Sequence, residues 1–149
     1  MNIPFLHHLQ SLTGPPLNKI VGVAPAGPGR ANAEGLLRRV LGGLPELVAA
    51  AVGEVADGRL LASYTSSKDF DPAKIIGFNA AVLRQQQQAL KALGLSEQQE
   101  QLTELLITLR RQLHLLRLLP DGKRFLYVAV DCHDTNLAIA REVMRTCDT

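Results

Sequence analysis

The chain has 149 residues, the length of one ordinary domain with a single hydrophobic core. Hydrophobic residues make up 46% of it, which excludes wholesale disorder, and aromatic residues only 4%, too few for a stacking platform for single-stranded nucleic acid. The formal net charge is +2, so charge gives no reason to expect a polyanionic partner, and we expect no nucleic acid among its partners.

Residues 1–31 differ in composition from the rest of the chain. Five of the eight prolines and four of the twelve glycines lie here, so regular structure should be interrupted often. We predict a Pro/Gly-rich N-terminal arm over residues 1–31 and a folded domain over residues 32–149. The arm also contains one short amphipathic helical pattern, formed by Phe5, Leu6, Leu9 and Leu12.

A helix and a β-hairpin are predicted next. From Asn32 the apolar residues recur at helical spacing until Gly42, Gly43 and Pro45 end the pattern. Residues 47–55 are apolar at nearly every position, which is typical of a strand covered on both faces. Asp57-Gly58 supplies turn chemistry, and residues 59–65 return as a second strand. The small residues of the first strand leave two possibilities open, a ligand pocket or close packing of a helix.

The second half of the chain is predicted to hold a long helix, three strands and a last helix. Asp71 caps the long helix and Pro72 lies in its first turn, while Gly94 stops it after Leu93. Strands follow over residues 102–109, 113–119 and 125–131, with an Asp121-Gly122 turn between the last two and a turn without glycine near residues 110–112. The last helix is capped by Asp134 or Thr135, and its inward face is expected to hold Leu137, Ala140, Val143, Met144 and Cys147.

The order of these elements predicts the fold class. Helix, strand, strand, helix, strand, strand, strand, helix, joined by hairpin-length links, indicates an α+β fold with a five-stranded, mostly antiparallel sheet. Helices on both faces explain why the first strand is apolar throughout, so we predict a three-layer α/β/α sandwich.

Three stretches of the sequence carry a family resemblance. They are VGEVADGRLLAS (residues 52–63), LTELLITLRRQLHLLRLLPDGKRFLYVAVD (residues 102–131) and TNLAIAREVMR (residues 135–145). In this order they resemble the roadblock/dynein light chain family, and the chain looks like a bacterial member. The resemblance implies a homodimer, joined edge to edge through the first strand after the long helix, with the long helices side by side. It also implies a protein partner such as a small Ras-like GTPase, and no catalytic side chain.

The residue pattern of the long helix predicts a dimer independently of the family resemblance. Its apolar residues occupy a broader arc than one sheet requires, and Asn79 and Gln86 lie in the middle of that arc. The strand over residues 102–109 is expected at a sheet edge, and an apolar edge invites pairing with another chain. We therefore predict a dimer interface that contains Ile75, Phe78, Asn79, Val82, Gln86, Leu102, Leu105 and Ile107.

A cluster of cations predicts a second surface. Five basic residues lie between positions 110 and 124, against one acidic residue. Such a basic rim would orient an acidic protein surface and speed the encounter with it. The residues of this predicted partner rim are Arg110, Arg111, Arg117, Lys123 and Arg124.

The sequence shows none of the patterns that catalysis or metal binding requires. Its histidines and cysteines lack the recurrent spacing of a zinc site, and no nucleophile elbow, Walker loop or dinucleotide fingerprint occurs. No apolar run reaches the ~18 residues of a membrane span, and the N-terminus lacks the features of a signal peptide. We expect a cytoplasmic protein without enzymatic activity, cofactor, metal or membrane insertion.

The leading hypothesis is a non-catalytic homodimeric scaffold or regulator that binds a small Ras-like GTPase or a related partner protein. Two other functions fit the same patterns. One is a small sensory module that binds a ligand between the sheet and the helices. The other is a structural component of a secretion or cell-envelope complex.

Overall fold

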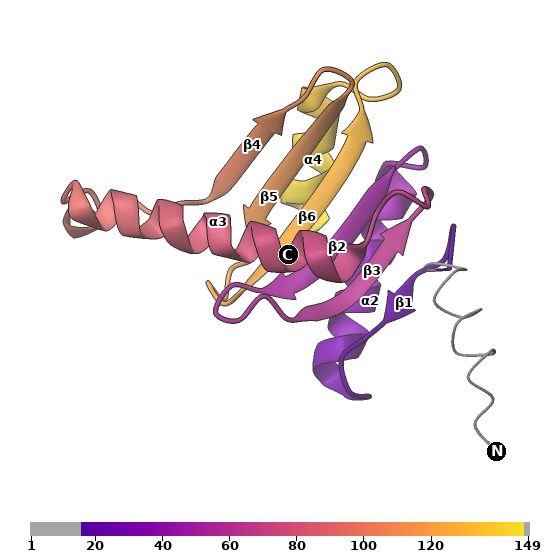
Figure 1. Ribbon diagram of the computed structural model, residues 1–149, viewed down its shortest axis with the longest axis horizontal. Helices are drawn as coiled ribbons and strands as arrows, with labels where there is room; N and C mark the ends of the chain where they lie inside the picture. Colours follow the sequence, from indigo (N-terminus) through magenta and orange to yellow (C-terminus); the bar gives the residue numbers. More distant parts are fainter. Residues whose placement is uncertain (1–15, 148–149) are drawn as a thin grey trace.

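The computed structural model describes residues 16–147 of the chain, so the helical pattern predicted within residues 5–12 lies outside the described residues. The elements appear in an order that agrees with most of the prediction (Figure 1). They are β1 (Val21–Gly22), α2 (Pro28–Gly43), β2 (Ala49–Glu54), β3 (Leu60–Thr65), α3 (Pro72–Ala92), the 3-10 helix η1 (Ser96–Gln98), β4 (Glu104–Thr108), β5 (Gln112–Leu118), β6 (Arg124–Asp131) and α4 (Leu137–Cys147).

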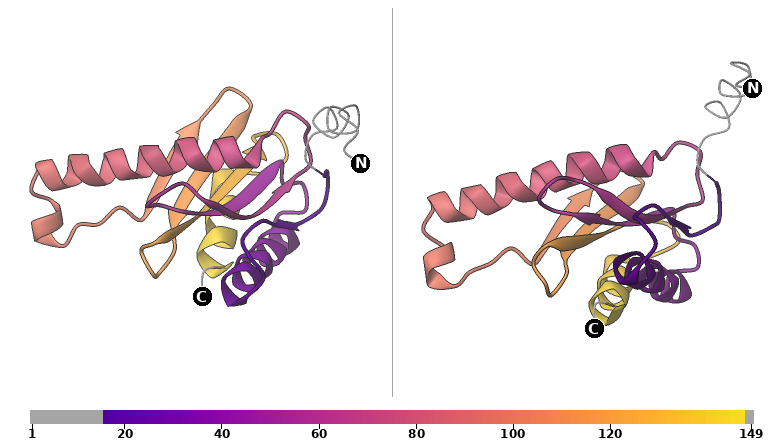
Figure 2. Two further views of the ribbon diagram at one scale, coloured as in Figure 1. Left: turned by 60° about the horizontal axis from the view of Figure 1, so that its bottom comes forward. Right: turned by 90° about the horizontal axis from the view of Figure 1, so that it is seen from below.

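Within the described residues the strands form one antiparallel sheet in the order β1-β3-β2-β6-β5-β4. Helix α3 lies across one face of this sheet, and α2 and α4 lie together under the other face (Figure 2). The first strand of the prediction, β2, is central and buried on both faces, as its continuous apolar run indicated. The two edges of the sheet are β1 and β4.

The prediction of five strands is wrong, because the described sheet has six. The additional strand is β1, which lies inside the segment predicted as an arm. The backbone N–H of Asn18 donates to the carbonyl of Thr65 at 2.8 Å, and that of Val23 donates to Leu61 at 2.9 Å. A strand of two residues between glycines and prolines is too short to produce a recognisable alternation. Helix α2 also begins earlier than predicted, at Pro28, because proline is favoured in a first helical turn.

The predicted hairpin turns are confirmed. Gly58 and Gly122 both have φ of 69°, a conformation that glycine adopts without steric cost. The turn that lacks glycine, between β4 and β5, also forms. The backbone N–H of Leu109 donates to Gln112 at 2.9 Å, and that of Cys132 donates to Arg111 at 2.8 Å. The hydrogen bond from Cys132, which follows β6, therefore stabilises this turn without any residue of positive φ.

The signals at the ends of α3 are confirmed, and those of α4 are partly wrong. The Asp71 side chain accepts a hydrogen bond from the backbone N–H of Lys74 at 3.3 Å, and Gly94 leaves α3 with φ of 74°. The cap of α4 is Asn136, whose side chain accepts from the N–H of Ile139 at 2.9 Å. Asp134 and Thr135 instead form a turn on the carbonyl of Asp131.

Helix α3 sits close to the sheet because β2 and its turn are made of small residues. A Cβ atom at Gly53 would overlap the side chain of Ile76, and one at Gly58 would lie 3.0 Å from the Cα of Gly77. Ala49 and Ala51 belong to one buried cluster together with Ile76, Phe125 and Tyr127. Of the two possibilities that the small residues left open, the structure shows close packing.

We expect Gly53→Val to lower the free energy of unfolding by about 1–3 kcal/mol, because the added side chain must push Ile76 out of the core. Urea denaturation followed by circular dichroism measures this change. Gly42→Ala is the control, because nothing lies within 4 Å of an added Cβ there and a helix gains up to about 1 kcal/mol from the exchange. Equal stability of the Gly53→Val variant and the unsubstituted chain would contradict the close approach.

Candidate interaction surface

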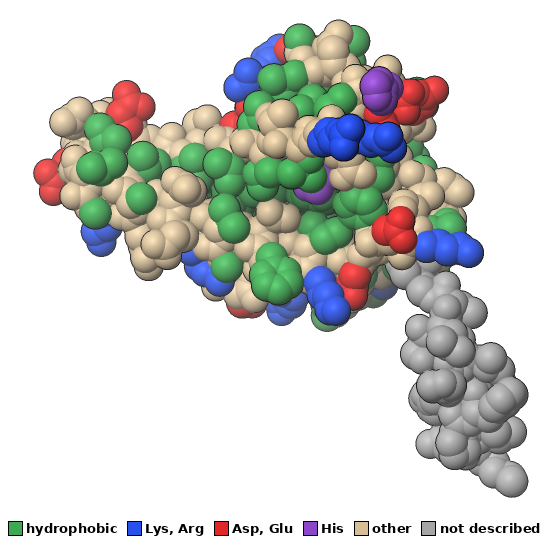
Figure 3. Space-filling model, turned by 45° about the horizontal axis from the view of Figure 1, so that its top comes forward, with side chains coloured by type: hydrophobic (Ala, Val, Ile, Leu, Met, Phe, Trp, Pro, Cys, Tyr) green, Lys and Arg blue, Asp and Glu red, His purple; other side chains and the backbone are tan. Residues whose placement is uncertain are grey.

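Helix α3 buries only a narrow stripe of its surface. Ile76, Ala80 and Leu83 are fully buried against the sheet, at the spacing of one helix face. The neighbouring flank of the same helix is apolar but open: Phe78 is 73% exposed, Val82 38% and Leu93, just past the helix end, 71%. Hydrophobic side chains form a band along α3 and across the strands beside it (Figure 3). Exposed apolar patches of this kind are typical of interaction surfaces.

Two amide side chains lie on this open flank. Asn79 is half-buried, and its amide nitrogen donates to the carbonyl of Ile75 in the same helix at 2.9 Å. Gln86, seven residues further on, is exposed. The amide hydrogen bond seen for Asn79 stays within α3, so it does not tie this flank to the sheet.

The edge strand β4 lies on the same side of the molecule. Leu105 opposes Leu116 on β5 and Ile107 opposes His114, so both point to the face that α3 covers only in part. Backbone hydrogen bonds at both ends of the β4–β5 pair involve the odd-numbered β4 residues, Thr103 and Leu109. In an antiparallel ladder the even-numbered residues then direct their N–H and C=O groups to the open edge. This edge is available to another strand.

The structure thus brings the eight residues of the predicted dimer interface to two adjoining places. Ile75, Phe78, Asn79, Val82 and Gln86 lie on the open flank of α3, and each is half-buried or exposed. Leu102, Leu105 and Ile107 are half-buried at the start of β4 and along it. No residue of this set lies in the fully buried core of the described chain.

A polar cluster that the sequence patterns did not indicate lies on the same sheet face. The His114 ring contacts Gln112 Oε1 through Nε2 at 2.9 Å and the Tyr127 hydroxyl through Nδ1 at 3.3 Å. The Phe70 ring lies 6.2 Å away, measured between ring centroids. Burial lowers the pKa of His114 and raises the pKa of Tyr127. These contacts fit a neutral imidazole that donates from Nε2 and accepts at Nδ1.

The predicted partner rim does not form one surface. Arg110 and Arg111 are exposed at the β4–β5 turn, whereas Lys123 is exposed at the β5–β6 turn, at the opposite end of β5. Arg117 faces α4 and lies 3.8 Å from Glu104. Arg124 is bound to Asp121 at 2.7 Å and to Asn32 at 2.7 Å. Each hairpin reverses the chain, so the turns before and after β5 lie at opposite ends of that strand. Charges that follow one another in the sequence are therefore separated in space, and the sequence pattern did not reveal this.

No protein-family model and no curated protein matches the sequence. Solved structures do match. MglB from Myxococcus xanthus superposes with a TM-score of 0.71 at 10% identity, over 85% of this chain and 89% of that one. The gliding protein MglB from Thermus thermophilus gives 0.66 at 15% identity, over 85% and 90%. A roadblock/LC7 domain from Streptomyces avermitilis gives 0.59 at 14% identity, over 79% and 89%.

This chain has the roadblock/LC7 fold. The likeness covers 79–85% of this chain and supports the resemblance that the three sequence stretches indicated. At identities of 10–15% it establishes the fold and leaves the partner to be argued from the surface.

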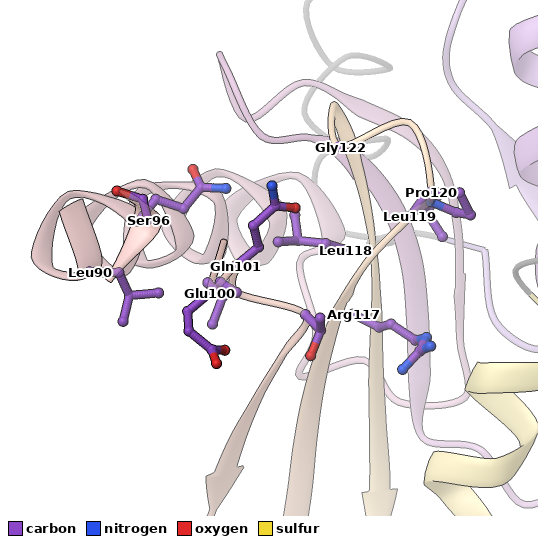
Figure 4. A pocket seen from close by; sticks show the side chains of 12 residues that line it. Leu90, Ser96, Glu100, Gln101, Arg117, Leu118, Leu119, Pro120 and Gly122 are labelled. Atoms are coloured by element: carbon purple, nitrogen blue, oxygen red, sulfur yellow. The ribbon is translucent and has the colours of Figure 1, made fainter. Parts of the chain in front are cut away.

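A cleft of about 460 Å³ opens in this roadblock/LC7 fold between the end of α3 and the outer strands (Figure 4). Leu90, Ser96, Gln101 and Leu118 line it, and the guanidinium of Arg117 points away from the other labelled side chains. Its walls come from α3, from η1 and the segment between η1 and β4, and from the end of β5 with the turn that follows it.

Neither a metal site nor a membrane span occurs in the part of the chain that the structure describes. Residues 16–147 contain no group of three or more His, Cys, Asp or Glu side chains placed to hold a metal ion. None of the helices in that range combines the length and hydrophobicity needed to cross a membrane. Of the two cysteines, Cys147 is buried and Cys132 is exposed.

We expect the stability of the protein to fall as the pH is lowered from about 7, in part because of His114. Burial depresses its pKa in the folded state below the ordinary 6.5, so the unfolded chain takes up a proton at a higher pH than the folded chain does. This contribution is complete above pH 6.5 and is lost as the pH falls through the folded pKa. Thermal unfolding at several pH values should give a flatter profile for His114→Gln than for the unsubstituted chain. His133→Gln, at an exposed histidine, should leave the profile unchanged.

Proposed function

We propose that this protein is a non-catalytic homodimeric regulator or scaffold that binds a small Ras-like GTPase or a related partner protein. One observation carries the proposal: the apolar flank of α3 adjoins an open edge strand, and neither has a partner within the described chain. A second copy would satisfy both at once, because β4 would pair with β4 while the α3 helices cover each other. An interface of about 800 Å² per copy is the usual size of a stable complex and is plausible for this geometry.

The GTPase part of the proposal rests on the family resemblance and on solved structures with the same fold. The roadblock/dynein light chain resemblance implies small Ras-like GTPases as partners of bacterial members. The solved structures with the same fold include two MglB proteins, one of them described as a gliding protein. A regulator without catalytic side chains would act by binding one conformation of the GTPase better than the other, which shifts the population toward that conformation.

We expect Phe78→Glu combined with Val82→Glu to convert the dimer to a monomer, because the shared interface would have to bury two uncompensated carboxylates from each copy. Light scattering coupled to size-exclusion chromatography measures the mass. Ala81→Glu with Gln88→Glu is the matched control, since these exposed residues add the same charge on the side of α3 opposite Gln86. A variant that keeps the mass of two copies would rule out this flank as the interface.

We expect the dimer to bind a Ras-like GTPase of the same organism differently in its GTP-loaded and GDP-loaded forms. Surface-immobilised GTPase, loaded with either nucleotide, gives the two affinities by biolayer interferometry. The Phe78→Glu/Val82→Glu variant shows whether binding requires the dimer. Equal affinity for both nucleotide states would remove the regulatory role and leave a scaffold.

A further inference from the structure

The two ends of β4 carry opposite charge. Glu97 and Glu100 lie in the segment that leads into the strand, and Arg110 and Arg111 form the turn that leaves it. All four side chains are exposed. Within residues 16–147 none of them makes an ion pair. The carboxylate inside the strand behaves differently, because Glu104 is bound to Arg141 at 2.6 Å on the α4 side of the sheet.

The backbone of β4 restricts how a second copy can add to it. Its open edge presents the N–H and C=O groups of Glu104, Leu106 and Thr108, as the ladder with β5 requires. A two-fold axis perpendicular to the sheet makes such a pair of edges antiparallel and keeps the α3 helices of both copies on the same face. Pairing that uses the whole strand places Leu106 opposite Leu106 of the second copy, and Glu104 opposite Thr108 of the second copy.

The same register brings the charged ends together. Continuing it by four residues places Arg110 opposite Leu102 of the second copy, and Glu100 of that copy lies only two residues, or about 7 Å of extended chain, further on. The basic turn of each copy then faces the acidic segment of the other, at both ends of the paired strands. Parallel pairing would instead set the two basic turns against each other and the two acidic segments against each other.

We propose that Arg110 and Arg111 pair with Glu97 and Glu100 of a second copy of this chain, and that these charges select antiparallel pairing through β4. The inference rests on the proposed homodimer and names what fixes its orientation. It assigns to self-association two of the arginines that the sequence pattern gave to a separate partner. Exposed ion pairs contribute little each, but like charges brought into register act against the wrong arrangement.

The test uses charge reversal in the full chain. Arg110→Glu with Arg111→Glu should weaken the dimer on the order of tenfold or more, because both ends change from attraction to repulsion. Glu97→Arg with Glu100→Arg should weaken it similarly. Analytical ultracentrifugation gives the dissociation constants at about 50 mM and about 1 M salt, and the loss should shrink at the higher concentration, where charges are screened.

Two combinations sharpen the result. An equimolar mixture of the two charge-reversal variants should form a heterodimer at least as tight as the unsubstituted homodimer, and the fourfold variant should recover homodimerisation. Lys19→Glu with Arg38→Glu is the matched control, because it changes the net charge equally and lies toward the other edge of the sheet. Circular dichroism of each variant confirms that it is folded.

The possible outcomes distinguish a failure of the charge pairing from a failure of the proposed homodimer. If the unsubstituted chain dimerises and the Arg110→Glu/Arg111→Glu variant does so with equal affinity, the charge pairing is overturned while the dimer stands. Lack of rescue in both the mixture and the fourfold variant also overturns it, since the charges then act without facing each other. If the unsubstituted chain is monomeric at all accessible concentrations, the proposed homodimer fails first.

Discussion

The exposed apolar surface of this protein exists because the sheet can bury only one stripe of α3. A helix on a sheet contacts it along one stripe, and here that stripe consists of Ile76, Ala80 and Leu83. The remaining apolar residues of α3 cannot turn toward the same sheet, because a helix places successive side chains around its axis. Their exposure within residues 16–147 is a consequence of helix geometry, and a second body placed beside α3 would remove it.

The close approach of α3 to β2 strengthens this constraint. Gly53 and Gly58 let the helix backbone come near the sheet, so its first turns pack tightly over β2 and β3. The later turns project beyond the sheet, as Figure 1 shows. They extend the open flank, which begins at Ile75, toward the side where β4 ends the sheet. Close packing at two glycines therefore brings an apolar helix flank and an unpaired strand edge onto the same side of the molecule.

Polar groups on this surface restrict the orientation of a bound partner more than they raise the affinity for it. Asn79 and Gln86 lie on the same flank, His114 and Tyr127 bond to each other on the sheet face, and charges of opposite sign bracket β4. Apolar area favours association without specifying an arrangement, whereas hydrogen-bonding groups and charges penalise arrangements that leave them unpaired. The apolar surface would thus favour association in general, and the polar groups would select the orientation of the partner.

The sequence alone determined most of the local structure. Asp-Gly turns, the Asp71-Pro72 start of α3 and the continuous apolar run of β2 each encode a backbone conformation or a burial state within a few neighbouring residues, and all three predictions are confirmed. Even the breadth of the apolar arc on α3 was visible, because it depends only on helical periodicity. The order of the elements, together with three sequence stretches, suggested the family.

Tertiary structure decided what depends on contacts between distant segments. Strand β1 exists because Asn18 and Val23 find partners on β3, and two residues hold too little pattern to indicate it. The five cations predicted as one rim separate because hairpins carry them to opposite ends of β5 and because Arg117 and Arg124 find acidic partners. Periodicity shows which face of an element is apolar; only the packed fold shows which of those faces has no neighbour.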